Sequence, residues 1–209
     1  MQVLKALVEG VGINATCRMT GVAKNTVLKL LAEVGVACAR YMDEHLRNLS
    51  CKRVQCDEIW SFCYSKQKNV PTAKAGKFGY GDVWTWTAID ADTKLCVSYL
   101  VGLRDVEWAK VFMSDLASRL TGRIQLTTDG HRAYMQAVEG AFGWDIDYMM
   151  LVKLYGNDPS PAKFATARRF ARASSTTSSA ALPTPGTSAP AAGVTDHVWE
   201  LEEVIGLLS

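Results

Sequence analysis

The chain has 209 residues, of which 48% are hydrophobic and 21% are charged, and its mean hydropathy is +0.01. This composition is that of a globular protein with one core and a smaller additional part, and it excludes a wholly disordered or fibrous chain. No apolar run reaches the roughly 18 residues of a transmembrane helix, and no signal peptide is recognisable. We therefore expect a cytoplasmic protein with no membrane partner.

The net charge of +2 is divided unevenly along the chain. Residues 51–158 carry thirteen basic and thirteen acidic groups, residues 159–192 carry four basic and no acidic groups, and residues 193–209 carry four acidic and no basic groups. Because the total is nearly balanced, a nucleic-acid partner must be argued from motifs and not from bulk charge. The six cysteines make up under 3% of a chain in which no export signal is recognisable, so we expect reduced thiols. They include no CxxC pair, which argues against a zinc site.

The amino-terminal part, residues 1–50, is predicted to be helical. Apolar residues at helical spacing predict three helices within residues 2–34, with a glycine turn at Gly21 before the third. Val27, Leu30, Leu31 and Val34 are expected on one apolar face of that third helix. Helix, short helix, glycine turn and helix is the layout of a helix-turn-helix, whose last helix enters the major groove of DNA.

Polar residues are expected on the outer side of these helices. Their types suit contacts to phosphates and base edges, and they are the candidate DNA-binding residues. These residues are Arg18, Thr20, Lys24, Asn25 and Lys29. A plain three-helix packing module is the alternative for this segment.

From Arg53 the pattern changes to the alternation of strands. Three strands are predicted near residues 53–64, 83–89 and 95–101, joined as an antiparallel meander. A helix capped by Asp105, a strand at 124–128, a helix at 131–139 and a strand at 144–152 follow. This order is typical of a ribonuclease-H-like, mixed α/β domain over residues 51–158, in which the first and fourth strands are neighbours.

Two aspartates stand out in that domain. Asp57 lies in the middle of the first strand, with Glu58 as an exception on the apolar side, and Asp129 ends the fourth strand. Aspartate is unfavourable in strands, and a lone buried carboxylate is costly unless it is paired or binds a metal. If the two strands are neighbours, both carboxylates can hold divalent cations such as Mg²⁺ or Mn²⁺. An edge strand and a simple Asp-Gly turn are the alternatives.

Several separate strings resemble the insertion-sequence-one family of bacterial transposases. They are CDEIWSF (56–62), TTDGHRAY (127–134), TGVAKNTVLKLL (20–31), MLVKLYGNDP (150–159) and AAGVTDHVWELEEVIGLL (191–208). The resemblance implies metal-dependent cleavage and strand transfer of DNA, with element ends and target DNA as partners and two metal ions. It implies that Asp57 and Asp129 are the first two catalytic and metal-binding residues of an Asp-Asp-Glu triad. We also expect self-association, association with the nucleoid, and no small-molecule substrate.

The sequence departs from this family after residue 158, where members carry a helix with the catalytic glutamate. The ribonuclease-H-like domain over residues 51–158 is therefore expected to be incomplete. Of the 34 residues 159–192, 26 are Ala, Ser, Thr or Pro, a composition that predicts disorder. Residues 193–209 are predicted to form a short acidic helix. An internal deletion with a local change of reading frame explains the departure, and a natural flexible linker is the alternative.

None of the other acidic residues is a convincing substitute for the missing glutamate. We therefore expect a transposase that is defective in this copy. A catalytically inactive DNA-binding remnant that inhibits intact transposase is one alternative. A helix-turn-helix regulator with a ligand-binding α/β domain is the other, and it does not require Asp57 and Asp129 to lie together.

Overall fold

The computed structural model describes residues 2–151 and residue 206. The segments predicted to be disordered (159–192) and to form an acidic helix (193–209) lie outside the described residues, apart from Gly206. The described chain forms two compact units that divide between Arg47 and Asn48. Within the described part, no helix is long and apolar enough to span a membrane.

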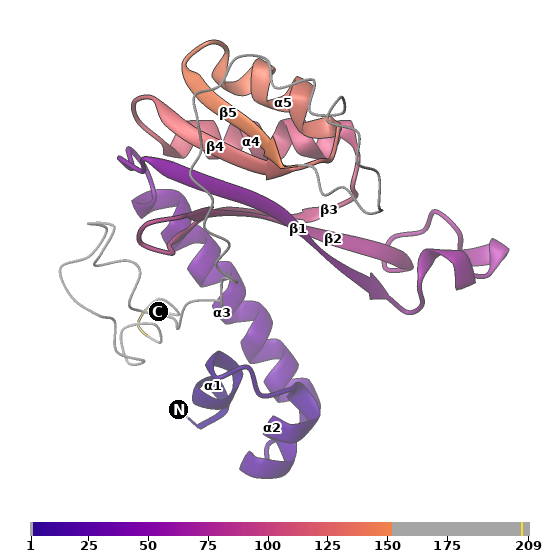
Figure 1. The fold of residues 1–209 in the computed structure, drawn as a ribbon. Helices are drawn as coiled ribbons and strands as arrows, with labels where there is room; N and C mark the ends of the chain where they lie inside the picture. The colour runs from indigo at the N-terminus through magenta and orange to yellow at the C-terminus, as the bar shows by residue number, and fades with distance from the viewer. Residues whose placement is uncertain (1, 152–205, 207–209) are drawn as a thin grey trace, which may run out of the picture. The chain divides into compact units, whose positions relative to one another are not determined.

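The amino-terminal unit consists of three helices, α1 (Gln2–Val8), α2 (Ile13–Thr20) and α3 (Lys24–His45) (Figure 1). Gly21 ends α2 with a φ of 70°, and its N–H donates to the Cys17 carbonyl. A left-handed residue at this position is the usual end of a helix and favours glycine. The three predicted helices are therefore present, separated at the predicted glycine turn.

The third helix differs from the prediction in length and in its buried face. It extends to His45, and its buried positions are Val27, Val34 and Ala37. Leu31 was expected on this face, and that prediction is wrong because 41% of the residue is exposed. At 3.6 residues per turn, a stripe through Val27, Val34 and Ala37 turns away from Leu31.

The second unit contains a five-stranded mixed sheet with the strand order β3-β2-β1-β4-β5. The strands are β1 (Arg53–Cys63), β2 (Gly81–Asp90), β3 (Cys96–Gly102), β4 (Ile124–Asp129) and β5 (Ile146–Leu151). β1, β2 and β3 pair antiparallel, whereas β4 runs parallel to both β1 and β5. The predicted meander and the predicted pairing of the first and fourth strands are both confirmed.

Helices α4 (Val106–Arg119) and α5 (Ala133–Phe142) pack together on one face of this sheet (Figure 1). Trp86 of β2 is fully buried there, with ring contacts to Phe112 of α4 at 5.8 Å and Tyr134 of α5 at 5.4 Å. The Trp86 indole N–H donates to the Leu103 carbonyl at 3.0 Å, which satisfies its polar atom within the core. Asp105 caps α4, as predicted, by accepting from the Trp108 N–H at 3.0 Å.

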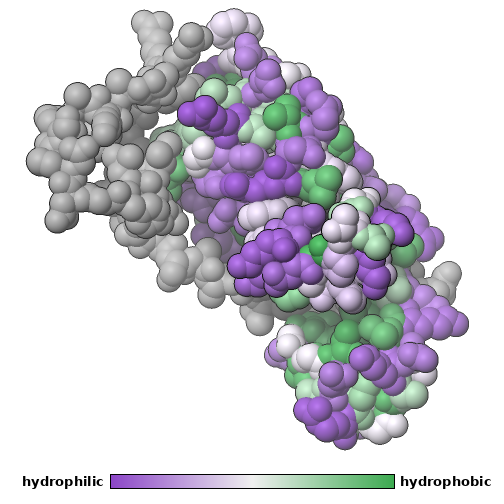
Figure 2. All heavy atoms as spheres, turned by 90° about the vertical axis from the view of Figure 1, so that its right-hand side faces the viewer, coloured by the Kyte–Doolittle hydropathy of each residue, from purple (hydrophilic) through white to green (hydrophobic). Residues whose placement is uncertain are grey.

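The hairpin of β1 and β2 continues past the helices to two short 3-10 turns, η1 (Gln67–Asn69) and η2 (Thr72–Lys74) (Figure 1). This end of the hairpin faces the viewer in Figure 2, where hydrophilic side chains lie beside apolar ones. All six cysteines lie among the described residues, and none forms a disulfide in the structure.

Candidate metal centre

The candidate site lies where β1 and β4 diverge. Their parallel pairing matches Arg53 with Gln125 and Gln55 with Thr127. Two residues beyond the last paired positions of each strand are Asp57 and Asp129. In the sheet, β2 and β3 follow β1 on one side, whereas β4 and β5 lie on its other side, so the strand order switches between β1 and β4. Open α/β sheets bind ligands next to such a switch point, at the carboxyl ends of the strands.

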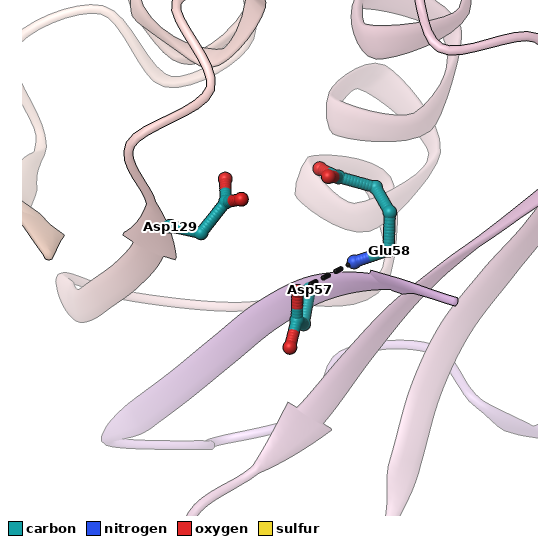
Figure 3. Close-up of side chains that lie close together, drawn as sticks. All are labelled: Asp57, Glu58 and Asp129. Atoms are coloured by element: carbon teal, nitrogen blue, oxygen red, sulfur yellow. Dashed lines mark hydrogen bonds between the residues drawn. The ribbon is translucent and has the colours of Figure 1, made fainter. Parts of the chain in front are cut away.

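Three carboxylates converge at this point. One oxygen each from Asp57, Glu58 and Asp129 lies within 4.8 Å of the other two. Figure 3 shows Asp57 and Glu58 leaving β1 in different directions, with Asp129 reaching in from β4. Two oxygens that bind one ion lie at most about 4 Å apart for Mg²⁺, which binds at about 2.0–2.1 Å, and about 5 Å apart for Ca²⁺, which binds at about 2.3–2.6 Å. The cluster therefore has about the size of the ligand shell of one hard cation, and Mg²⁺ would draw the three oxygens closer together.

Backbone N–H groups orient both aspartates. The Glu58 N–H donates to Asp57 Oδ1 at 2.8 Å, and the His131 N–H donates to Asp129 Oδ1 at 2.9 Å. In each case the second carboxylate oxygen is not held by the backbone. These bonds fix the orientation of each carboxylate and leave one oxygen of each free of backbone contacts.

Glu58 is the residue of this cluster that the sequence did not identify as a site residue. Its side chain is only 1% exposed, and its Oε2 accepts from Arg104 Nε at 2.9 Å. Arg104 Nη2 reaches Asp129 Oδ2 at 3.2 Å, so one guanidinium joins the two carboxylates. The only sequence signal for Glu58 was its place on the apolar side of the strand.

Buried polar atoms belong to this part of the molecule. Among the described residues, Glu58 Oε1, His131 Nε2 and Tyr134 Oη are buried and make no hydrogen bond of normal geometry, and the Tyr134 hydroxyl lies near the Glu58 carboxylate. Burial raises the pKa of Tyr134 well above its ordinary value, and the nearby Cys56 and Glu58 add to this effect. Tyr134 therefore keeps its proton. An all-oxygen donor set with a buried, unpaired carboxylate oxygen fits a hard divalent cation such as Mg²⁺ or Mn²⁺.

Other acidic candidates lie apart from the cluster. Asp147 is paired with Arg123, whose Nη2 lies 2.6 Å from its Oδ1, and Asp145 lies 3.8 Å from the same guanidinium. Arg123 lowers the pKa of Asp147, which is the effect of a surface ion pair and not of a metal site. Glu139 is exposed on α5.

The candidate DNA-binding residues all belong to the amino-terminal unit. Arg18, Lys24, Asn25 and Lys29 are exposed, and Lys29 Nζ lies 3.7 Å from Glu33. The Thr20 hydroxyl instead donates to the Thr16 carbonyl at 2.8 Å and accepts from the Val22 N–H at 3.3 Å.

Comparisons with known proteins give only distant similarity. No protein-family model matches the sequence, and no curated protein matches it. The structure is similar to the Mos1 transposase paired-end complex with left transposon end, at 14% identity and a TM-score of 0.31, over 71% of this chain and 56% of that chain. A Mos1 mariner paired-end complex with Mn matches at 13% identity and a TM-score of 0.28, over 69% of this chain and 56% of that chain. The chain thus spans about half the length of the structures that it resembles, and the similarity is weak.

We predict that Arg104→Met destabilises the metal-free protein because it leaves Glu58 buried without its counter-charge. Breaking a buried ion pair costs about 3–5 kcal/mol, and partial exposure of Arg104 reduces the expected loss to about 2–3 kcal/mol. The double variant Glu58→Gln/Arg104→Met should recover about half of it. Urea unfolding in the presence of a chelator measures both values.

Lys110→Met is the matched control, because Lys110 pairs with Glu107 at 2.8 Å on the exposed side of α4. Exposed pairs contribute about 0–1 kcal/mol. If Arg104→Met costs no more than Lys110→Met, the guanidinium does not hold the cluster together.

Proposed function

We propose that the chain is a DNA-binding protein of the transposase type, with a divalent-metal site formed by Asp57, Glu58 and Asp129. The convergence of these three carboxylates at the switch in strand order is the observation that carries the proposal. The resemblance of separate sequence strings to the insertion-sequence-one family supports it independently. We also propose that residues 51–158 form a ribonuclease-H-like domain and that residues 1–50 form a helix-turn-helix segment.

The described residues have distinct parts in such a site. Asp57 and Asp129 would hold the cation, and the backbone N–H groups that they accept from keep their carboxylates oriented. A bound Mg²⁺ or Mn²⁺ supplies charge stabilisation for phosphoryl transfer. Arg104 balances the negative charge of Glu58 and Asp129 and lies where a phosphate could take over one of its contacts.

The geometry favours one bound cation over two. Consecutive strand residues project to opposite faces, so Asp57 and Glu58 approach the cluster from two sides of β1. Two-metal phosphoryl transfer needs ions about 3.5–4 Å apart, and each ion needs its own ligands. The third triad residue of the family follows residue 158, where this sequence departs from it. We therefore propose that strand transfer is defective in this copy, which makes it a DNA-binding relative of intact transposases.

Exposed basic residues on α2 and α3 support DNA binding by the amino-terminal unit. Lys24 and Asn25 lie in the first turn of α3, after the left-handed Gly21 that separates the two helices. In a helix-turn-helix the first residues of the second helix contact base edges. Thr20 is a weaker candidate because its hydroxyl is already hydrogen-bonded at the end of α2.

We predict that the protein binds one Mn²⁺ ion per chain and that Asp129→Asn weakens this binding at least tenfold, because the substitution removes a charged ligand from the cluster. Isothermal titration or the electron paramagnetic resonance of free Mn²⁺ measures both quantities. Asp145→Asn is the control, since that side chain is 77% exposed and outside the cluster. Unchanged affinity in Asp129→Asn would contradict a metal site at this position.

Strand transfer is expected to be undetectable with either Mg²⁺ or Mn²⁺, because the cluster offers ligands for one cation, whereas two-metal phosphoryl transfer would need ligands for a second. The assay combines the protein with a pre-cleaved element end and a supercoiled target. A version carrying a restored glutamate-bearing helix after residue 158 is the positive comparison. Robust joining by the present chain that is lost in Asp57→Asn would show that another carboxylate, with Glu58 the first candidate, completes the site.

We predict that Lys24→Ala/Lys29→Ala weakens binding to a duplex element end and makes it less sensitive to salt. Each phosphate contact contributes about 0.9 to the slope of log affinity against log salt for duplex DNA, so loss of two contacts should reduce the slope by about 1.8. A fluorescence anisotropy series across salt concentrations gives the slope. Equal slopes for the wild type and the variant would show that Lys24 and Lys29 of α3 do not contact DNA phosphates.

A further inference from the structure

The outer half of the β1–β2 hairpin carries a surface that the proposed function does not use. We define the hairpin arm as residues 59–84. Between residues 64 and 80 it contains four lysines and no acidic residue. Its aromatic side chains are unusually exposed, and Trp60, Phe62, Tyr64 and Phe78 expose 39%, 47%, 63% and 105% of their surface.

The aromatic residues continue the line of the carboxylate cluster. Trp60 and Phe62 follow Glu58 at intervals of two along β1, so the three side chains leave the same face of the strand. Trp84 pairs with Trp60 across the hairpin, and the Arg104 guanidinium lies 4.9 Å from the Trp84 ring centre. From Glu58 to Phe62 the strand covers about 13 Å at about 3.3 Å per residue, and Tyr64 follows directly after β1 ends at Cys63. An aromatic track therefore leads from the site to the end of the arm.

Lysines of the arm lie over these rings. Lys66 Nζ is 5.0 Å from the Trp60 ring centre, and Lys74 Nζ is 4.4 Å from that of Tyr64 and 4.9 Å from that of Tyr80. Tyr64 and Tyr80 meet edge to face at 5.1 Å, across the base of the turns. An exposed cation–π contact contributes only about 0.5–1 kcal/mol. A phosphate, with a full negative charge, can attract these lysines away and leave ring faces free.

The arm has a fixed shape at its base. The Gln67 N–H donates to Asp82 Oδ1 at 2.9 Å, and the Asp82 N–H donates to Gln67 Oε1 at 3.4 Å. Gly81 beside them has a φ of +99°, a conformation that requires glycine. The one acidic side chain of the arm is thus engaged in holding η1 on β2, and the lysines face a partner without an opposing charge.

We propose that the hairpin arm binds a single strand of nucleic acid and leads its backbone to the carboxylate cluster. Proteins that bind single strands combine a basic surface for phosphates with aromatic faces on which bases stack, and the arm provides both along one line. A protein partner would not need four lysines without an acidic residue, and a duplex would not present free base faces to Trp60 and Phe62. The inference rests on the proposed function in that the strand delivered to the cluster is DNA.

The test measures binding of a short fluorescent oligothymidylate by anisotropy across a salt series, in the presence of a chelator. Lys66→Ala/Lys74→Ala should weaken binding roughly tenfold and reduce the salt slope by about 1.4, since a single-strand contact contributes about 0.7. Trp60→Leu should weaken binding severalfold without changing the slope, because it removes stacking and not charge.

A second lysine pair and two controls keep the result unambiguous. Lys68→Ala/Lys77→Ala removes the same charge from exposed positions of the arm, and should reduce the slope in the same direction even if the first pair disturbs the arm. Lys52→Ala/Lys94→Ala removes the same charge from the opposite end of the β1–β2 pair and should leave single-strand binding unchanged. Lys24→Ala/Lys29→Ala should affect duplex binding but not oligothymidylate binding.

The inference is overturned if both arm pairs bind oligothymidylate as the wild type does, or if Lys52→Ala/Lys94→Ala loses as much affinity. Because the assay contains no free metal, its outcome is independent of the Mn²⁺ titration. Arm-dependent binding without a metal site would support single-strand binding by the arm and would discard the proposed function. A metal site without arm-dependent binding would overturn the inference and leave the proposed function standing.

Discussion

The ion pairs of Arg104 make the acidic cluster possible. Three carboxylates within 4.8 Å repel one another by roughly 3 kcal/mol for each charged pair at an effective dielectric constant of about 20. Glu58 adds a desolvation cost because it is almost fully buried. The guanidinium offsets both effects by bonding to Glu58 and Asp129 at once. A cation that binds the cluster therefore competes with a charge that the protein itself supplies.

The position of Arg104 follows from how α4 begins. Asp105, the next residue, caps the helix through the Trp108 N–H, and this fixes the turn that leads out of β3. The turn points the Arg104 side chain back across the sheet, where its guanidinium stacks on Trp84 and reaches β1 and β4. One helix cap thus determines where the positive charge of the site lies, and it joins the acidic cluster to the aromatic side chains of the hairpin arm.

Much of the second unit could be predicted from local patterns. Alternation identified the strands, and the expected adjacency of β1 and β4 brought Asp57 and Asp129 together, because their spacing along parallel strands is the same. Glu58 and Arg104 could not be found in this way. Strand periodicity placed Glu58 on the buried side, where it looked like an exception, and its partner is 46 residues away in a loop. Pairing across that separation is decided by the tertiary fold and leaves no local signal.

The two proposed DNA contacts depend on a short connection between the units. Helix α3 ends at His45, and Leu49 is already fixed in the second unit, where its N–H donates to the Arg119 carbonyl and its carbonyl accepts from the Thr121 N–H, both at 2.9 Å. Only residues 46–48 lie between the end of α3 and Leu49, whereas Lys24 and Lys29 belong to the first turns of α3 and the hairpin arm begins at residue 59. A short tether raises the effective concentration of the second surface once the first has bound, to about millimolar values for flexible linkers. Two weak, salt-sensitive surfaces can therefore give firm binding to DNA in which a duplex adjoins an unpaired strand, and neither surface has to be strong by itself.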